Sequence, residues 1–136
     1  MPSSVDAAIL SKMAERGQIT GGIVDGPLAM DNAMNLEAAM AKGLNLRVAG
    51  RADVLIVPNI EAGNMLAKDL IFVSGAASAG LVVGASVPII LTSRSDDAAA
   101  RVASCAVALA YDVWRRTGEP IMDWAALAEA PPSQKA

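Results

Sequence analysis

Two apolar segments, residues 54–57 and 87–91, each run directly into a polar loop that can open a helix. Their runs of valine, isoleucine and leucine have the length and the β-branched character of buried strands. In α/β folds, ligands bind at such loops, where the carboxyl ends of strands meet the amino ends of helices. The sequence therefore predicts an α/β protein whose functional residues follow these two segments.

The segment from residue 70 to 93 carries no charged side chain and is long enough to cross a bilayer. However, Gly75, Gly80, Gly84 and Pro88 interrupt it at short intervals, and two strand-length runs lie within it. Two buried parallel strands explain this pattern better than a membrane span does. We therefore expect no membrane as a partner.

The composition limits the classes of function. With 136 residues, of which 54% are hydrophobic and 18% charged, the chain has the makeup of one folded globular domain. The net charge is −3 and the basic residues are scattered, so no nucleic-acid partner is expected. The lack of histidine excludes Ser-His and Cys-His catalytic systems and most zinc sites, and no metal site is predicted. The single cysteine, Cys105, and the lack of a secretory leader favour the cytoplasm.

The periodicity of the apolar residues predicts helices that alternate with strands. Helices are expected at residues 5–16, 36–42, from 61 onward and at 97–116, and strands at 19–24, 54–57, near Leu81 and near Ile89. This alternation predicts an α/β fold with a largely parallel sheet and flanking helices. Ser3 or Ser4 is expected to cap the first helix and Asn59 the third. Residues 119–136, rich in alanine and proline, are expected to form a loosely held tail.

The last predicted helix has two contrasting stripes. Val102, Ala106, Leu109 and Val113 form an apolar stripe, opposite a polar stripe of Arg101, Ser104, Asp112 and Arg115. We expect the apolar stripe to face the core. Cys105, in the same helix, is expected to be a small packing residue.

Polar groups gather in three loops, of which the first two are explained partly by local structure. The turn chemistry of residues 25–33 is accounted for by chain reversal alone. In residues 58–64, Asn59 can cap the next helix. A cap does not explain Gly63, which lowers the stability of the first helical turn but lets a ligand or another backbone approach closely.

The third loop, residues 92–96, places Arg94 between two serines at the start of a helix. A guanidinium group, hydroxyl groups and free helix amides can all donate hydrogen bonds to one phosphate oxyanion. A surface ion pair between Arg94 and Asp96 or Asp97 accounts for the same residues equally well. At this point both interpretations remain open.

Three sequence blocks become specific when they are taken together. They read GQITGGIVDGPLAMDNA (residues 17–33), ADVLIVPNIEAGNMLAK (52–68) and VPIILTSR (87–94). In this unbroken order they resemble the phosphate acetyl/butyryltransferase family, most closely its butyryl-type and hydratase-fused members, from Gly17 to about Tyr111. The resemblance implies transfer of an acyl group between coenzyme A (CoA) and inorganic phosphate. The CoA thiolate would attack the acyl phosphate directly, without a metal or a covalent enzyme intermediate, and CoA would be a substrate rather than a permanently bound cofactor.

The resemblance also implies an architecture. The family has a two-domain α/β fold similar to that of isopropylmalate dehydrogenase, with the site in the interdomain cleft, and is usually homodimeric. Residues 1–118 would form the C-terminal part of such a fold, followed by the tail at 119–136.

The site residues implied by the resemblance lie in the second and third loops. The family's Ser-Arg pair falls on Ser93, which would donate a hydrogen bond to the reacting carbonyl or phosphate, and on Arg94, which would bind the phosphate. The substrate- and CoA-binding set would be Asn59, Gly63, Asn64, Lys68 and Thr92.

Two positions depart from the family pattern. Asn59 stands where an aspartate is usual. Ala100 stands where acetyl-type members have the aspartate thought to deprotonate the thiol, so Asp96 or Asp97 would have to act as the base.

The chain is also short for this family. The family's catalytic units are more than twice as long, and the resemblance covers only their C-terminal portion, without the further arginines that help to hold the acyl phosphate. We interpret Met1 as an internal methionine of a split, truncated or misannotated gene. The leading hypothesis is an acyltransferase segment that needs a partner carrying the other half, or acts as a homodimer. The alternative is a non-catalytic module, a remnant that binds CoA or phosphate and dimerises. A helical scaffold without a ligand is the third option, and the polar loops favour it least.

Overall fold

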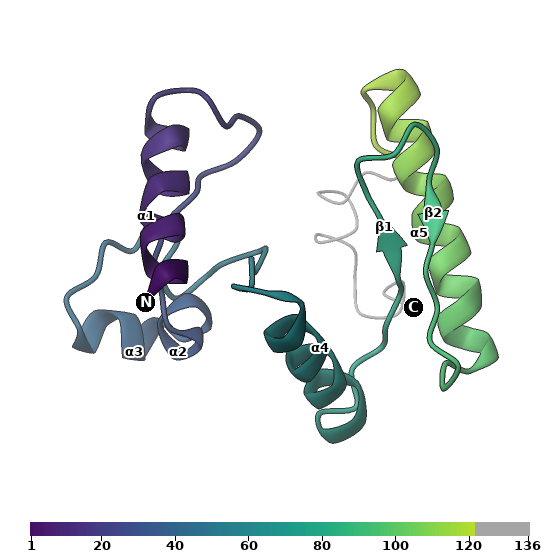
Figure 1. Cartoon of the computed structure of the whole chain (residues 1–136), viewed down its shortest axis with the longest axis horizontal. Helices are drawn as coiled ribbons and strands as arrows, with labels where there is room; N and C mark the ends of the chain where they lie inside the picture. Colours follow the sequence, from purple (N-terminus) through teal and green to yellow (C-terminus); the bar gives the residue numbers. More distant parts are fainter. Residues whose placement is uncertain (122–136) are drawn as a thin grey trace, which may run out of the picture. The chain divides into compact units, whose positions relative to one another are not determined.

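The computed structural model describes residues 1–121, and the chain divides after Leu66 into two compact units, of which the described residues are 1–66 and 67–121 (Figure 1). Its helices are α1 (Pro2–Glu15), α2 (Met30–Met34), α3 (Leu36–Ala41), α4 (Ile60–Lys68) and α5 (Ala98–Thr117), with a π-helical turn at Asp69–Val73; its strands are β1 (Leu81–Val82) and β2 (Ile89–Ile90). Helix α4 crosses the boundary between the units. The predicted tail lies, from residue 122 onward, outside the described residues.

Helix α1 confirms the first predicted helix but begins earlier. Its first residue is Pro2, whose fixed φ and missing N–H suit the first position of a helix. The residue at the N-cap is Met1, without a side-chain cap, so the predicted cap by Ser3 or Ser4 is wrong. The helix gives way to a turn in which Gly17 has a φ of +72°.

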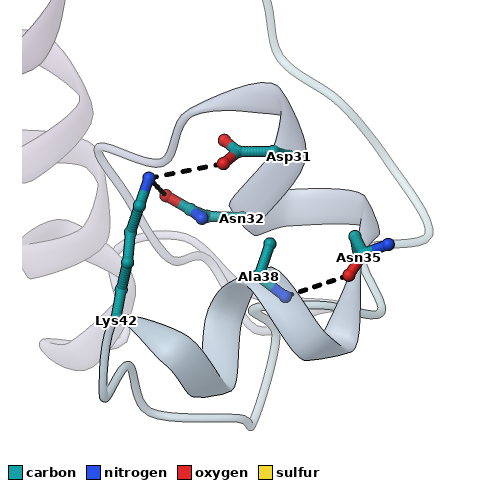
Figure 2. Close-up of polar contacts among 5 residues, drawn as sticks. All are labelled: Asp31, Asn32, Asn35, Ala38 and Lys42. Atoms are coloured by element: carbon teal, nitrogen blue, oxygen red, sulfur yellow. Dashed lines mark hydrogen bonds and ion pairs between the residues drawn. The ribbon is translucent and has the colours of Figure 1, made fainter.

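Helices α2 and α3 form a small helical pair joined at Asn35. The Asn35 side chain accepts a hydrogen bond from the Ala38 N–H (2.9 Å) and so caps α3, whose predicted range is confirmed (Figure 2). Helix α2 was not predicted and replaces the end of the predicted turn at residues 25–33. The buried apolar residues of this unit are all alanines: Ala33, Ala39 and Ala49.

The predicted strands at residues 19–24 and 54–57 are not formed in this structure. A strand is stable only when its backbone groups pair with a neighbouring strand, and neither segment pairs with another among the described residues. Several of their apolar side chains are exposed, with Ile56 at 82%, whereas Ile19, Val24 and Leu55 are half-buried. Periodicity identified segments suited to strands but could not supply their partners.

Strands β1 and β2 pair antiparallel, with Leu81 opposite Ile90 and Val82 opposite Ile89. The prediction that these two strands run parallel and are fully buried is therefore wrong. A parallel pair needs a crossover connection of about a dozen residues or more, and residues 83–88 are too few to make one. The short connection can only reverse the chain.

Helix α5 lies against both strands (Figure 1). Its predicted range is confirmed: the Asp97 side chain accepts a hydrogen bond from the Ala100 N–H (2.8 Å) at the start, and Gly118, with a φ of +75°, follows its end. Both are strong local signals for helix termini.

The face of α5 turned to the strands is not the predicted one. The buried residues of the helix are Ser104 and Ala108, whereas Val102 and Leu109 are 69% and 62% exposed. Successive residues advance by about 100° around a helix, so these two pairs lie on opposite sides. Of the predicted core stripe, Val102, Ala106 and Leu109 are thus exposed and Val113 is half-buried; Cys105, expected to pack, is exposed too.

Candidate functional site

In the loop between β2 and α5, Ser93 forms hydrogen bonds with side chains of the same loop. The Ser93 N–H donates a hydrogen bond to Oδ2 of Asp96 (2.6 Å), and the Ser93 hydroxyl oxygen lies 2.9 Å from that of Ser95. The Ser95 N–H also donates to the Ser93 hydroxyl oxygen (3.3 Å). Ser93 is half-buried and lies three residues beyond the end of β2.

Arg94, next in the chain, is exposed and makes no ion pair with any residue in the described range 1–121. Asp96 accepts the Ser93 N–H and Asp97 caps α5, each through one carboxylate oxygen. The surface ion pair is not formed among residues 1–121, and the oxyanion-binding interpretation stays a prediction. A guanidinium without a protein partner can donate two parallel hydrogen bonds to a phosphate.

Asp96 and Asp97 are each held by a backbone amide, and each carboxylate has a second oxygen. Asp97 also lies at the N-terminus of a helix of 20 residues, where the helix dipole favours negative charge. The loop therefore combines a hydroxyl donor, a cation and two carboxylates within residues 93–97.

At the start of α4, the predicted cap is confirmed. Oδ1 of Asn59 accepts a hydrogen bond from the Ala62 N–H (2.8 Å). Gly63 has a packing reason, since a Cβ there would lie 3.0 Å from Cγ2 of Val57. Asn64 is exposed.

Lys68 ends α4 and is half-buried. Its Nζ lies 5.2 Å from the centroid of the Phe72 ring, a cation–π distance. The ammonium group therefore has an aromatic contact and keeps its hydrogen-bond donors.

The nine predicted site residues fall in both units. Asn59, Gly63 and Asn64 belong to the first unit, and Lys68, Thr92, Ser93, Arg94, Asp96 and Asp97 to the second. Within the second unit, the loop brings Ser93 and Asp96 into a direct hydrogen bond, with Thr92 and Arg94 beside them in the chain.

Sequence reasoning missed a polar cluster between α2 and α3. Nζ of Lys42 donates hydrogen bonds to Oδ1 of Asn32 (2.8 Å) and Oδ2 of Asp31 (3.3 Å), as Figure 2 shows. Asn32 is buried, and its Nδ2 has no hydrogen-bond partner among the described residues. The Asp31-Asn32 pair was visible in the first sequence block, but nothing in the sequence connected it with a lysine ten positions later.

A cavity of about 340 Å³ lies in the first unit and includes none of the predicted site residues. Its lining contains Arg47 and the carboxylates of Glu15 and Asp25. The hydrogen bond from Lys12 and its positive charge lower the pKa of the Glu15 carboxyl from its ordinary value.

Across residues 1–121, no group of three or more histidine, cysteine, aspartate or glutamate side chains is placed to hold a metal ion. None of the helices described is both long enough and apolar enough to cross a membrane.

Comparison with known proteins gives consistent results. The family model for phosphate acetyl/butaryl transferase matches residues 1–109. The phosphate acetyltransferase of Rhizobium meliloti is 60% identical over 119 residues, which are 88% of this chain and 38% of the relative. The phosphate butyryltransferase of Clostridium beijerinckii is 53% identical over 108 residues, which are 79% of this chain and 36% of the relative.

Among solved structures, a branched-chain phosphotransacylase from Enterococcus faecalis V583 superposes with a TM-score of 0.69 at 38% identity. The match covers 80% of this chain and 39% of that one. The chain thus spans a little over a third of the length of these relatives.

Proposed function

The chain belongs to the phosphate acetyl/butaryl transferase family, and we propose that it is the C-terminal segment of an enzyme that transfers an acyl group between CoA and inorganic phosphate. Relatives named as phosphate acetyltransferases and phosphate butyryltransferases support this reaction. The observation that carries the proposal is the loop after β2, where Ser93, hydrogen-bonded to Asp96, is followed in the chain by Arg94, an exposed residue without an ion pair among residues 1–121.

In the proposed reaction, Arg94 binds the phosphate group of the acyl phosphate and offsets its charge. The Ser93 hydroxyl donates a hydrogen bond to the reacting carbonyl or to the phosphate, and free amides in the first turn of α5 add further donors. Asp96 or Asp97 accepts the proton of the CoA thiol. The thiolate forms a bond with the acyl carbon, the bond from that carbon to the phosphate oxygen breaks, and phosphate leaves with the electron pair.

Asn59, Gly63, Asn64, Lys68 and Thr92 are proposed to contact the substrates, with CoA bound as a substrate and not as a resident cofactor. We further propose that residues 1–118 form part of a two-domain α/β fold similar to that of isopropylmalate dehydrogenase, in which β1 and β2 join a larger sheet. The partner is either a chain that supplies the rest of this fold or a second copy, and the proposed location is the cytoplasm.

A second candidate function is a non-catalytic module that binds CoA or phosphate and dimerises. Ala100 favours it, because the resemblance places the thiol-deprotonating aspartate at this position. The two candidate functions predict different results when the rest of the enzyme is supplied: the acyltransferase segment should then support turnover, and the non-catalytic module should not. We use "complemented enzyme" for this chain mixed with the part of the Rhizobium meliloti enzyme outside the matched region.

Arg94→Ala is expected to abolish measurable binding of CoA or phosphate by the chain and to leave the fold intact. An exposed cation at the end of a strand contributes little to stability, about 0 to 1 kcal/mol for surface pairs. Calorimetric titration with CoA and with inorganic phosphate measures the effect. Arg101→Ala, which removes an exposed arginine from α5, is the matched control. Unchanged affinity in Arg94→Ala would remove this residue from the site.

Asp96→Asn or Asp97→Asn is expected to lower the turnover of the complemented enzyme by roughly 10²- to 10⁴-fold and to change KM much less. Asparagine keeps the amide-accepting oxygen at both positions and is as good a helix cap as aspartate, so each variant should fold. Steady-state kinetics on both variants decides which residue accepts the proton. Full activity in both would mean that the thiol is deprotonated elsewhere.

A further inference from the structure

Ser104 is the most deeply buried polar side chain of α5, with 1% of its surface exposed. Its hydroxyl donates a hydrogen bond to the Ala100 carbonyl one turn earlier (2.7 Å), a common arrangement for serine in a helix. The same oxygen accepts a hydrogen bond from the Gly80 N–H (3.0 Å), 24 positions earlier in the chain. This second bond contributes nothing to the helix itself and connects α5 to the start of β1.

Gly80 is also hydrogen-bonded to the segment that follows β2. Its carbonyl accepts a hydrogen bond from the Leu91 N–H (3.2 Å). A Cβ at Gly80 would overlap the Leu91 carbonyl oxygen, so these two backbone segments lie as close as backbone can. The place of Leu91 is therefore fixed by that of Gly80, and Leu91 is two residues before Ser93.

The far end of the loop is fixed on the same helix, since Asp97 caps α5. Between the two anchors, the Ser93 N–H donates to Asp96. The loop is thus held at Leu91, through Gly80 and Ser104, and again at Asp97. From this chain of contacts we infer that Ser104 is a positioning residue, which sets the place of Ser93 and Arg94 for the acyl transfer proposed above, on which the inference rests. Ser104 touches no substrate and acts through the backbone of residues 80 and 91.

Amide hydrogen exchange on the full chain, measured by NMR, tests the connection without any activity. In Ser104→Ala, the amides of Gly80, Leu91 and Ser93 are expected to exchange about tenfold faster, while the amide of Leu109 keeps its rate. Cys105→Ala removes one side-chain atom from the adjacent, exposed position and should change none of the four rates. Ser104→Thr keeps the hydroxyl and should retain the protection.

Two results of that experiment would overturn the inference. Faster exchange at Gly80 with an unchanged rate at Ser93 would confine the role of Ser104 to the strand. Equal acceleration at Leu109 would mean that Ser104 stabilises the whole unit and does not position the loop.

Steady-state kinetics on the complemented enzyme provide a second test of the role of Ser104. Ser104→Ala is expected to lower kcat by roughly ten- to a hundredfold, since small misplacements of a catalytic group are costly, with KM for CoA within about twofold. Ser104→Thr should restore kcat, and Cys105→Ala should match the unmodified chain. An unchanged kcat in Ser104→Ala would overturn the inference. If the unmodified complemented enzyme is inactive, the proposed function fails, and the exchange rates still decide the role of Ser104.

Discussion

The purified chain, alone in solution, is expected to show little or no acyltransferase activity and to self-associate. The apolar stripe of α5 is the reason: Val102 and Leu109 are largely exposed, on the side of the helix away from the strands. Each large apolar side chain left in water forgoes roughly 1.5 to 3 kcal/mol. That loss is large against the stability of a whole domain, about 5 to 15 kcal/mol. Self-association would cover part of this surface.

Sedimentation velocity and an acyl-phosphate assay on the pure chain measure both expectations. Leu109→Glu should weaken the self-association because it places a charge in the stripe. Arg101→Glu, which adds the same residue on the predicted polar stripe of α5, should not. A stable monomer with normal turnover would contradict the prediction.

The second large effect is expected for Gly50→Ala, which should lower the free energy of unfolding by several kcal/mol. Gly50 has a φ of +84°, and a Cβ there would lie 2.7 Å from the Cα of Leu36 in α3. Its N–H also donates to the Asn32 carbonyl oxygen (2.7 Å), so a shift of this backbone would disturb α2 as well. The left-handed conformation alone costs about 1 to 2 kcal/mol for a residue with a Cβ, and the overlap with backbone adds to it.

Gly43→Ala is the matched control. Gly43 also has a positive φ, +64°, but nothing lies within 4 Å of an added Cβ. Chemical denaturation of both variants should therefore show a smaller loss for Gly43→Ala, of about 1 to 2 kcal/mol. Equal losses in the two variants would show that the contact between residue 50 and α3 is not present.

The helix ends were predictable because their signals are local. Asn59 caps α4 and α5 begins after Asp97, both as predicted, whereas the predicted cap of α1 by Ser3 or Ser4 is wrong. A side chain that caps and a glycine that ends a helix act within three or four residues, so no distant partner is needed.

The strands were not predictable in the same way, because a strand needs a neighbour. Residues 54–57 have a strand-like sequence and remain unpaired in the described part of the chain. For β1 and β2, the direction of pairing follows from the length of the connection at residues 83–88, and apolar content carries no information about it.

The same limit applies to α5 and to the candidate site. The periodicity correctly identified two opposite stripes on α5, but it does not determine which stripe packs against the strands. Ser104, from the polar stripe, is buried there and its hydroxyl oxygen accepts a hydrogen bond from the Gly80 N–H. The loop of Ser93 and Arg94 was found because its residues are adjacent in the chain. The contacts of Lys42 and Ser104 join residues ten or more positions apart, which only the fold reveals.

We propose that this chain is part of a phosphate acyltransferase and becomes active when the rest of the fold is supplied. The most direct test is to mix it with the part of the Rhizobium meliloti enzyme outside the matched region and to follow formation of acyl-CoA from CoA and acetyl or butyryl phosphate. We expect turnover only in the mixture, and loss of that turnover when the chain carries Arg94→Ala. Absence of turnover in a mixture shown by sedimentation to contain the complex, or full turnover with Arg94→Ala, would contradict it.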